Sequence, residues 1–187
     1  DKAGGVTMEL KGADGFLQII GKSFGGLSIE EIEQAVAAAS VLKPLDLVVV
    51  DYLQNVTNDS FGNRNTLNYE RVKNVMERLT QMSNQYQCAT LALAQLNNPN
   101  RKNSSNAAPN LYDIADATAV VRDAAAVLMM YRDENEITKL KVAKSRYGTL
   151  TEGDLQLTRA PGSRFSFFDS SAPALTTAVP NVLSAGA

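Results

Sequence analysis

The chain has 187 residues, 44% of them hydrophobic, and a formal net charge of −2 at neutral pH. This suits one globular domain with a sizeable core and excludes a global electrostatic attraction to nucleic acid. Histidine is absent and Cys88 is the single cysteine, which excludes histidine acid–base chemistry, the common zinc sites and an internal disulfide. With no membrane-length apolar run and no signal peptide in the sequence, we expect a reducing, cytoplasmic setting without membrane contact.

The first half of the chain predicts alternating strands and helices. Residues 16–20 read as a strand, and Ser28 with Glu31 forms a capping box that opens a helix ending at Pro44. The apolar residues of that helix share one face, namely Ile29, Ile32, Val36 and Ala39. Residues 47–50 are a run of four apolar residues, typical of a strand buried on both faces. This order predicts right-handed crossovers and a parallel sheet.

Polar side chains follow two of the expected parallel strands. Asp51 comes directly after residues 47–50, and Gln95 ends the next apolar run, residues 90–94. The intervening helix carries an apolar stripe, Val72, Val75, Met76, Leu79, Met82 and Tyr86. Ligands of α/β folds bind at the carboxyl ends of such strands, so Asp51 is a candidate for holding Mg²⁺ and Gln95 for sensing a terminal phosphate. The alternatives are an aspartate that caps the following loop and a solvated glutamine.

The last third predicts antiparallel strands that extend one edge of the sheet. Residues 138–143, 154–158 and 164–168 alternate apolar and polar side chains. Lys144 and Arg146 follow as two cations at positions i and i+2, which on a strand would point the same way. The alternative is a basic strand end without a role. We expect the domain to occupy residues 1–171 and residues 172–187, which are uncharged and rich in small residues, to form a flexible tail.

The motif Gly21-Lys22-Ser23 is not a phosphate-binding P-loop. The P-loop pattern needs a glycine five residues before Gly21, where this chain has Phe16, and the residues between are bulky and strand-like. Since the chain opens at Asp1 rather than at a methionine, we expect it to be an excised or processed piece.

Four stretches in fixed order carry a family resemblance. They are Asp-Tyr-Leu-Gln at 51–54, Gln-Leu-Asn at 95–97, the segment 113–133 ending in Arg-Asp, and Lys-Ser-Arg-Tyr-Gly at 144–148. Over about residues 16–168 the chain resembles the C-terminal ATPase domain of DnaB-type replicative DNA helicases. The resemblance implies an α/β, RecA-like fold with a mostly parallel sheet, flanking helices and an antiparallel C-terminal edge extension. In that family the P-loop and a water-activating glutamate lie upstream of the stretch that matches this chain.

The resemblance also implies an activity and a set of roles. The intact protein would hydrolyse ATP with Mg²⁺ in a ring, usually a homo-hexamer, and unwind duplex DNA by moving along single-stranded DNA. Asp51 would hold Mg²⁺, and Gln95 would contact the nucleotide. Lys144 and Arg146 would reach the γ-phosphate bound by the neighbouring subunit. A primase and a helicase loader are the partners that the family implies.

Two segments are candidates for contacting DNA. Arg101 and Lys102 lie in a polar loop that could offer cations to a phosphate backbone, although a solvated basic loop would read the same way. The family's main DNA-gripping loop aligns with residues 113–118, which brings in Asp116 and Thr118. Here the chain departs from the family, with Ala115 in place of an arginine and Thr118 in place of a glycine.

Two rival functions stay open at the level of sequence. One is a RecA- or RadA-type recombinase ATPase, which would form a helical filament; the motifs at 51–54 and 144–148 argue against it. The other is a RecA-like binding or assembly module that hydrolyses nothing. A P-loop upstream, followed by a glutamate, would identify an ATPase.

Overall fold

The computed structural model describes residues 5–11, 15–22, 25–58, 68–96, 108–114, 117–148, 155–159 and 167–169. The chain forms two compact units, one of residues 1–99 with 110–124 and the other of residues 100–109 with 125–187. The expected tail at 172–187 lies outside the described residues. Within the described ranges, no helix is long and apolar enough to cross a membrane.

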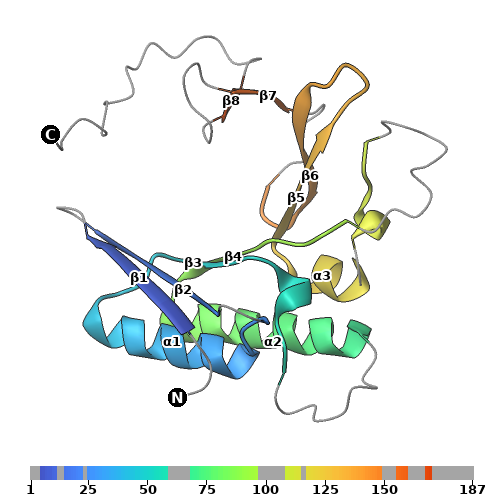
Figure 1. Ribbon diagram of the computed structural model, residues 1–187. Helices are drawn as coiled ribbons and strands as arrows, with labels where there is room; N and C mark the ends of the chain where they lie inside the picture. Colours follow the sequence, from blue (N-terminus) through green and yellow to red (C-terminus); the bar gives the residue numbers. More distant parts are fainter. Residues whose placement is uncertain are drawn as a thin grey trace, which may run out of the picture. The chain divides into compact units, whose positions relative to one another are not determined.

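The first unit begins with an antiparallel hairpin of β1 (Gly5–Lys11) and β2 (Phe16–Lys22) (Figure 1). The two strands pair along their whole length, from Gly5 opposite Lys22 to Lys11 opposite Phe16. The strand expected at 16–20 is therefore present, but its expected place in the parallel sheet is wrong for the described residues. The physical reason is local, because residues 6–11 also alternate apolar and polar side chains and offer a partner only a few residues away.

Helix α1 (Ile29–Leu42) forms as its sequence predicts. The Ser28 hydroxyl accepts from the Glu31 amide, and the Glu31 carboxylate accepts from the Ser28 amide at 2.8 Å, so the capping box is complete. The Glu31 carboxylate also pairs with the Lys22 ammonium at 2.6 Å, which ties the β1–β2 hairpin to the start of the helix. The four residues predicted to share one face are the buried ones, Ile29, Ile32, Val36 and Ala39.

Strands β3 (Leu47–Val50) and β4 (Ala89–Ala92) are parallel neighbours joined through helix α2 (Asn68–Tyr86). The apolar stripe of α2 is buried from Val72 to Met82. Helices α1 and α2 lie side by side along one face of the two strands (Figure 1).

The opposite face of β3 and β4 carries exposed apolar side chains in the described part of the chain. Its side chains are 42–55% exposed and comprise Leu47, Val49, Leu91 and Leu93. The expectation that residues 47–50 are buried on both faces is therefore wrong for the chain as described, because both helices cover the same side. The alternation of Val49 exposed and Val50 buried is that of a sheet covered on one face.

After β4 the chain of this unit resumes in a 3₁₀ turn, η2 (Leu111–Asp113), and helix α3 (Ala117–Asp123). Ala119 and Val120 are buried, and Arg122 reaches Glu77 of α2 at 3.3 Å. A short helix is thus present within the segment 113–133.

The second unit is an antiparallel sheet in the order β5 (Ala126–Arg132), β6 (Thr138–Ser145), β7 (Leu155–Arg159) and β8 (Phe167–Asp169). This confirms that the last third forms antiparallel strands. The β5–β6 turn is organised by Asp133, whose carboxylate accepts from the amides of Asn135 and Ile137 and pairs with Lys139 at 3.0 Å. Desolvation alone would raise the pKa of Asp133, but the Lys139 ammonium and the two amides lower it below its ordinary value.

Candidate functional site

Asp51 and Gln95 lie at the same end of the parallel strand pair. Val50 and Ala92 form the last registered pair, Asp51 follows Val50 directly, and Gln95 comes three residues after Ala92. Three hydrogen bonds join the two segments beyond that pair. The Leu93 amide donates to the Val50 carbonyl at 2.9 Å, the Leu53 amide donates to the Leu93 carbonyl at 2.9 Å, and the Gln95 amide donates to the side-chain oxygen of Gln54 at 3.2 Å.

The residues after Asp51 fold into a 3₁₀ turn, η1 (Leu53–Asn55), that follows a cis peptide between Asp51 and Tyr52. The Asn55 amide donates to the Tyr52 carbonyl at 3.0 Å, and Leu53 is 1% exposed. Asp51 therefore stands at a strand end whose next residues are fixed by a turn and by a buried leucine.

The segment before α1 forms hydrogen bonds with the residues that follow η1. The Thr57 amide donates to the Leu27 carbonyl at 3.0 Å, and the Ile29 amide donates to the Thr57 carbonyl at 2.9 Å. The two segments come so close at Gly26 that any Cβ there would overlap with the carbonyl group of Asn55. Gly26 is therefore needed for close approach of two backbones.

The chemistry of Asp51 suits a metal ion that is shared with a ligand. Its side chain is exposed, and the described residues contain no group of three acidic, cysteine or histidine side chains that could hold a metal by themselves. Magnesium at phosphates takes one or two protein carboxylates and fills its remaining positions with phosphate oxygens and water. A single exposed carboxylate at a strand end fits that requirement.

Lys144 and Arg146 belong to the second unit. Lys144 is in β6, whereas Arg146 lies just past the end of that strand, where its amide donates to the Ala125 carbonyl at 2.8 Å and its side chain is exposed. The expectation that both cations occupy one strand is therefore wrong for Arg146, because pairing with β5 ends at Ala126 opposite Ser145.

A register shift in β6 sets the face on which Lys144 lies. Val142 pairs with Leu128, but Lys144 pairs with Val127, which leaves Ala143 as an extra residue, as in a β-bulge. Residues directly opposite in an antiparallel pair share a face. The bulge thus moves Lys144 to the face of buried Val127 and away from that of exposed Leu128.

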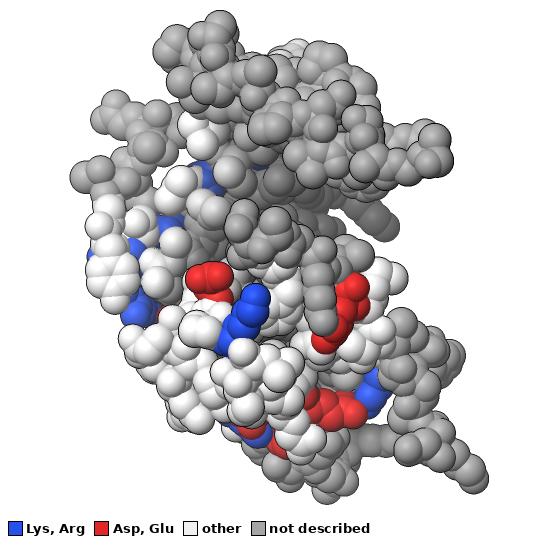
Figure 2. All heavy atoms as spheres, turned by 90° about the vertical axis from the view of Figure 1, so that its left-hand side faces the viewer, with Lys and Arg blue, Asp and Glu red and all other residues white. Residues whose placement is uncertain are grey.

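Of the candidate DNA residues, Arg101, Lys102 and Asp116 lie outside the described residues. Thr118 is the second residue of α3 and is exposed. Just before it, Ile114 is buried and forms an isolated antiparallel bridge with Leu96. The start of the segment 113–118 is therefore anchored next to the end of β4. On the face seen in Figure 2, acidic and basic side chains of the described residues are interspersed.

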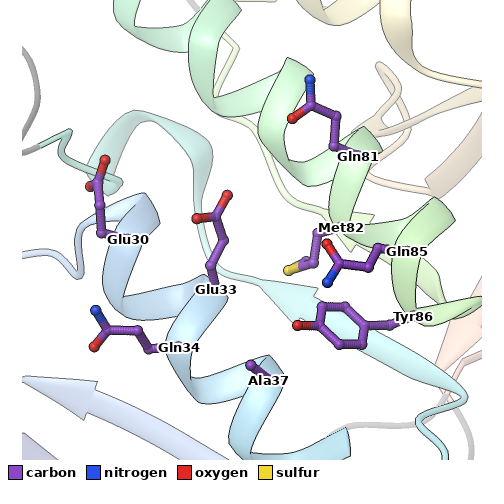
Figure 3. A pocket seen from close by; sticks show the side chains of 8 residues that line it. All are labelled: Glu30, Glu33, Gln34, Ala37, Gln81, Met82, Gln85 and Tyr86. Atoms are coloured by element: carbon purple, nitrogen blue, oxygen red, sulfur yellow. The ribbon is translucent and has the colours of Figure 1, made fainter.

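A groove of about 400 Å³ lies between α1 and α2, and side chains of the two helices face each other across it (Figure 3). Its rim includes Glu30 and Glu33, which both pair with Arg78, the Nε atom donating to Glu33 at 2.8 Å. The carboxylates of Glu33 and Glu30 raise the pKa of Arg78 despite its partial desolvation. None of the predicted site residues lines this groove, so it is separate from the candidate site. The ion pairs of Arg78 with Glu30 and Glu33 join the two helices beside it.

Two residues of this region escape prediction from sequence. Gln54 belongs to the motif at 51–54, yet only the structure shows that its amide reaches Gln95. Gly26 stands in a Gly25-Gly26 pair that signals a turn, and only the structure shows the approach to Asn55.

The fold and the strand ends define an α/β domain with a candidate ligand site where two parallel strands finish. A solved structure described as a DnaB-like replicative helicase and its interactions with primase superposes with a TM-score of 0.60 at 22% identity, covering 70% of this chain and 32% of that one. That similarity establishes a shared fold.

The sequence comparisons identify the family. Residues 14–166 match the model of the DnaB-like helicase C terminal domain, and the chain belongs to that family. It is 31% identical to the replicative DNA helicase DnaB of Treponema pallidum over 127 residues, 67% of this chain and 27% of the relative. It is also 31% identical to the replicative DNA helicase DnaB of Helicobacter pylori over 108 residues, 53% of this chain and 21% of the relative. The chain thus spans less than a third of these relatives.

Proposed function

We propose that this chain is part of the motor domain of an ATP-dependent replicative DNA helicase, which unwinds duplex DNA by moving along single-stranded DNA as a ring. The observation that carries the proposal is the pair Asp51 and Gln95. They follow neighbouring parallel strands, and three hydrogen bonds join their segments, in a chain of the DnaB-like family.

The cofactors of this proposal are ATP and Mg²⁺. Asp51 holds the metal at the nucleotide phosphates. When bound, Mg²⁺ neutralises charge on the phosphoryl group that is transferred. Gln95 places its amide beside the terminal phosphate. The P-loop comes from sequence outside this chain, and the open apolar face of β3 and β4 supports a larger domain in the intact protein, since such faces are normally covered.

Lys144 and Arg146 act in a neighbouring subunit of a homo-oligomer, most simply a hexamer. They belong to the unit that does not contain Asp51, and Arg146 is exposed at the end of β6. A guanidinium that stabilises charge on phosphate bound elsewhere is an arginine finger.

Single-stranded DNA is the proposed track, contacted by Arg101 and Lys102 and by the segment containing Asp116 and Thr118. If both cations contact phosphates, replacing Arg101 and Lys102 by alanine weakens single-strand binding. The slope of log K against log salt concentration then becomes shallower by roughly 0.7 per lost contact. A primase and a helicase loader are the proposed partners.

The test uses the intact protein and compares Asp51→Asn with Asp46→Asn. Asp46 is exposed and precedes the same strand at its opposite end, so it is a matched control. We expect Asp51→Asn to lower DNA-stimulated ATP hydrolysis by about 10²-fold or more, since the metal contributes several kcal/mol to the transition state, and Asp46→Asn to leave it unchanged. Wild-type protein that binds ATP but neither hydrolyses it nor unwinds a forked duplex would instead identify the non-hydrolysing module.

A further inference from the structure

The end of the parallel ladder continues through a side chain. Leu93 is bonded on both sides by the segment that contains Asp51, through the carbonyl of Val50 and the amide of Leu53. The next amide after Leu93 that points the same way belongs to Gln95. Its acceptor is the side-chain oxygen of Gln54, at 3.2 Å.

The backbone does not supply that acceptor. In a regular parallel ladder the amide two residues after Leu93 would donate to a carbonyl two residues after Val50, which is that of Tyr52. Here the chain turns into η1, and the Tyr52 carbonyl accepts from the Asn55 amide at 3.0 Å. The amide group of Gln54 thus takes the place of the missing rung.

The orientation of the Gln54 amide is fixed by this bond. Only its oxygen can accept from a backbone N–H, so the nitrogen is directed elsewhere. That nitrogen is buried and has no partner among the described residues. An unpaired buried donor is costly, which indicates that the bond to Gln95 is kept in spite of that cost.

We propose that Gln54 is a positioning residue that couples the Asp51 turn to Gln95 and thereby holds the Gln95 side chain toward the nucleotide. This inference rests on the proposed function for the role of Gln95, but the coupling itself does not. A change in the turn after Asp51 moves Gln54, and through it the backbone at Gln95.

The kinetic test is a double-mutant cycle in the intact protein, with the variants Gln54→Met and Gln95→Ala. Methionine keeps the length of the side chain and removes both amide atoms. We expect Gln54→Met to lower kcat by roughly 2- to 10-fold, the range of one net hydrogen bond, with nucleotide affinity unchanged. In the Gln95→Ala background the same substitution should have almost no effect, because residues that act through each other are not additive. The control Gln85→Met, an exposed glutamine on α2, should be neutral in both backgrounds.

A second measurement does not depend on hydrolysis. Hydrogen exchange of peptides covering residues 91–96 should be faster in Gln54→Met than in wild type. It should stay slow in Gln54→Glu, which keeps an acceptor for the Gln95 amide. Equal losses of kcat in the two backgrounds, or exchange unchanged in Gln54→Met, would overturn the coupling. Wild-type protein without ATP hydrolysis would refute the proposed function, and the exchange data would then decide the coupling alone.

Discussion

The close approach at Gly26 makes a quantitative prediction for Gly26→Ala. An added Cβ would lie 2.8 Å from the carbonyl carbon of Asn55 and nearer still to its oxygen, whereas real Cβ atoms essentially never come within 3.0 Å of such atoms. The segments must therefore separate, and the bonds of Thr57 to Leu27 and Ile29 lengthen from 3.0 and 2.9 Å. Overpacking costs about 1–3 kcal/mol and the two weakened bonds together cost about 1 kcal/mol, so we expect a loss of about 2–4 kcal/mol.

Thermal unfolding followed by circular dichroism measures this loss. A change of that size lowers Tm by about 5–15 °C in a chain of this length. Gly21→Ala is the matched control, because a Cβ at Gly21 meets nothing within 4 Å and any effect there reports only strand propensity. If Gly26→Ala melts within about 2 °C of wild type while folding normally, the packing of residues 25–29 against 55–57 is not as the structure shows.

Three further predictions concern the two units. Arg146→Ala in the intact protein should lower kcat by about 10³-fold or more, with nucleotide binding retained. Mixing this variant with Asp51→Ala should restore activity at interfaces that pair an intact Arg146 with an intact Asp51. Mixed rings that stay inactive although their subunits exchange would contradict action in trans. Deleting Ala143 should turn the bulge into a regular ladder in which Lys144 still lies opposite Val127, so hydrolysis should stay close to that of wild type, unlike in Lys144→Ala; a loss as large as that of Lys144→Ala would show that the bulge itself has a functional part. Glu31→Gln keeps the capping box but removes the charge of the carboxylate. Hydrogen bonds from Lys22 and from the Ser28 amide lower the pKa of Glu31. The ionised carboxylate therefore stabilises the fold at and above the ordinary pKa of 4.5, and this stabilisation is lost as the pH falls through the lowered pKa. In urea unfolding the variant should be less stable than wild type at pH 7 by under about 1 kcal/mol, given the screening of a partly exposed pair, and equal to it in acid; a gap that widens in acid would contradict the sign.

Local signals predicted the helices and the core of the first unit. The capping box at Ser28 and the apolar spacing of α1 and α2 act within one or two turns, so they determine the helices wherever the chain lies. The apolar run before Asp51 also sufficed for β3, because a β-branched run next to turn residues favours a strand in any context.

Pairing and register could not be predicted in the same way, since they depend on which partner is available. Strand β2 pairs with β1, which the sequence analysis did not assign, and not with β3. The bulge at Ala143 changes the face of Lys144 without any glycine or proline to signal it. The role of Gln54 depends on a carbonyl that is already used inside η1, a competition that is visible only in three dimensions.

Each of the two candidate site groups is held by bonds inside its own unit. The segment after Asp51 is fixed to the end of β4 through Leu53 and Gln54, and Arg146 is fixed to β5 through the carbonyl of Ala125. Neither arrangement requires a contact between the units. This independence suits the proposed role of Arg146, because an arginine finger acts on a nucleotide held by another subunit. Substitutions that loosen one unit should therefore affect only one side of each interface, and a wild-type neighbour should compensate for them.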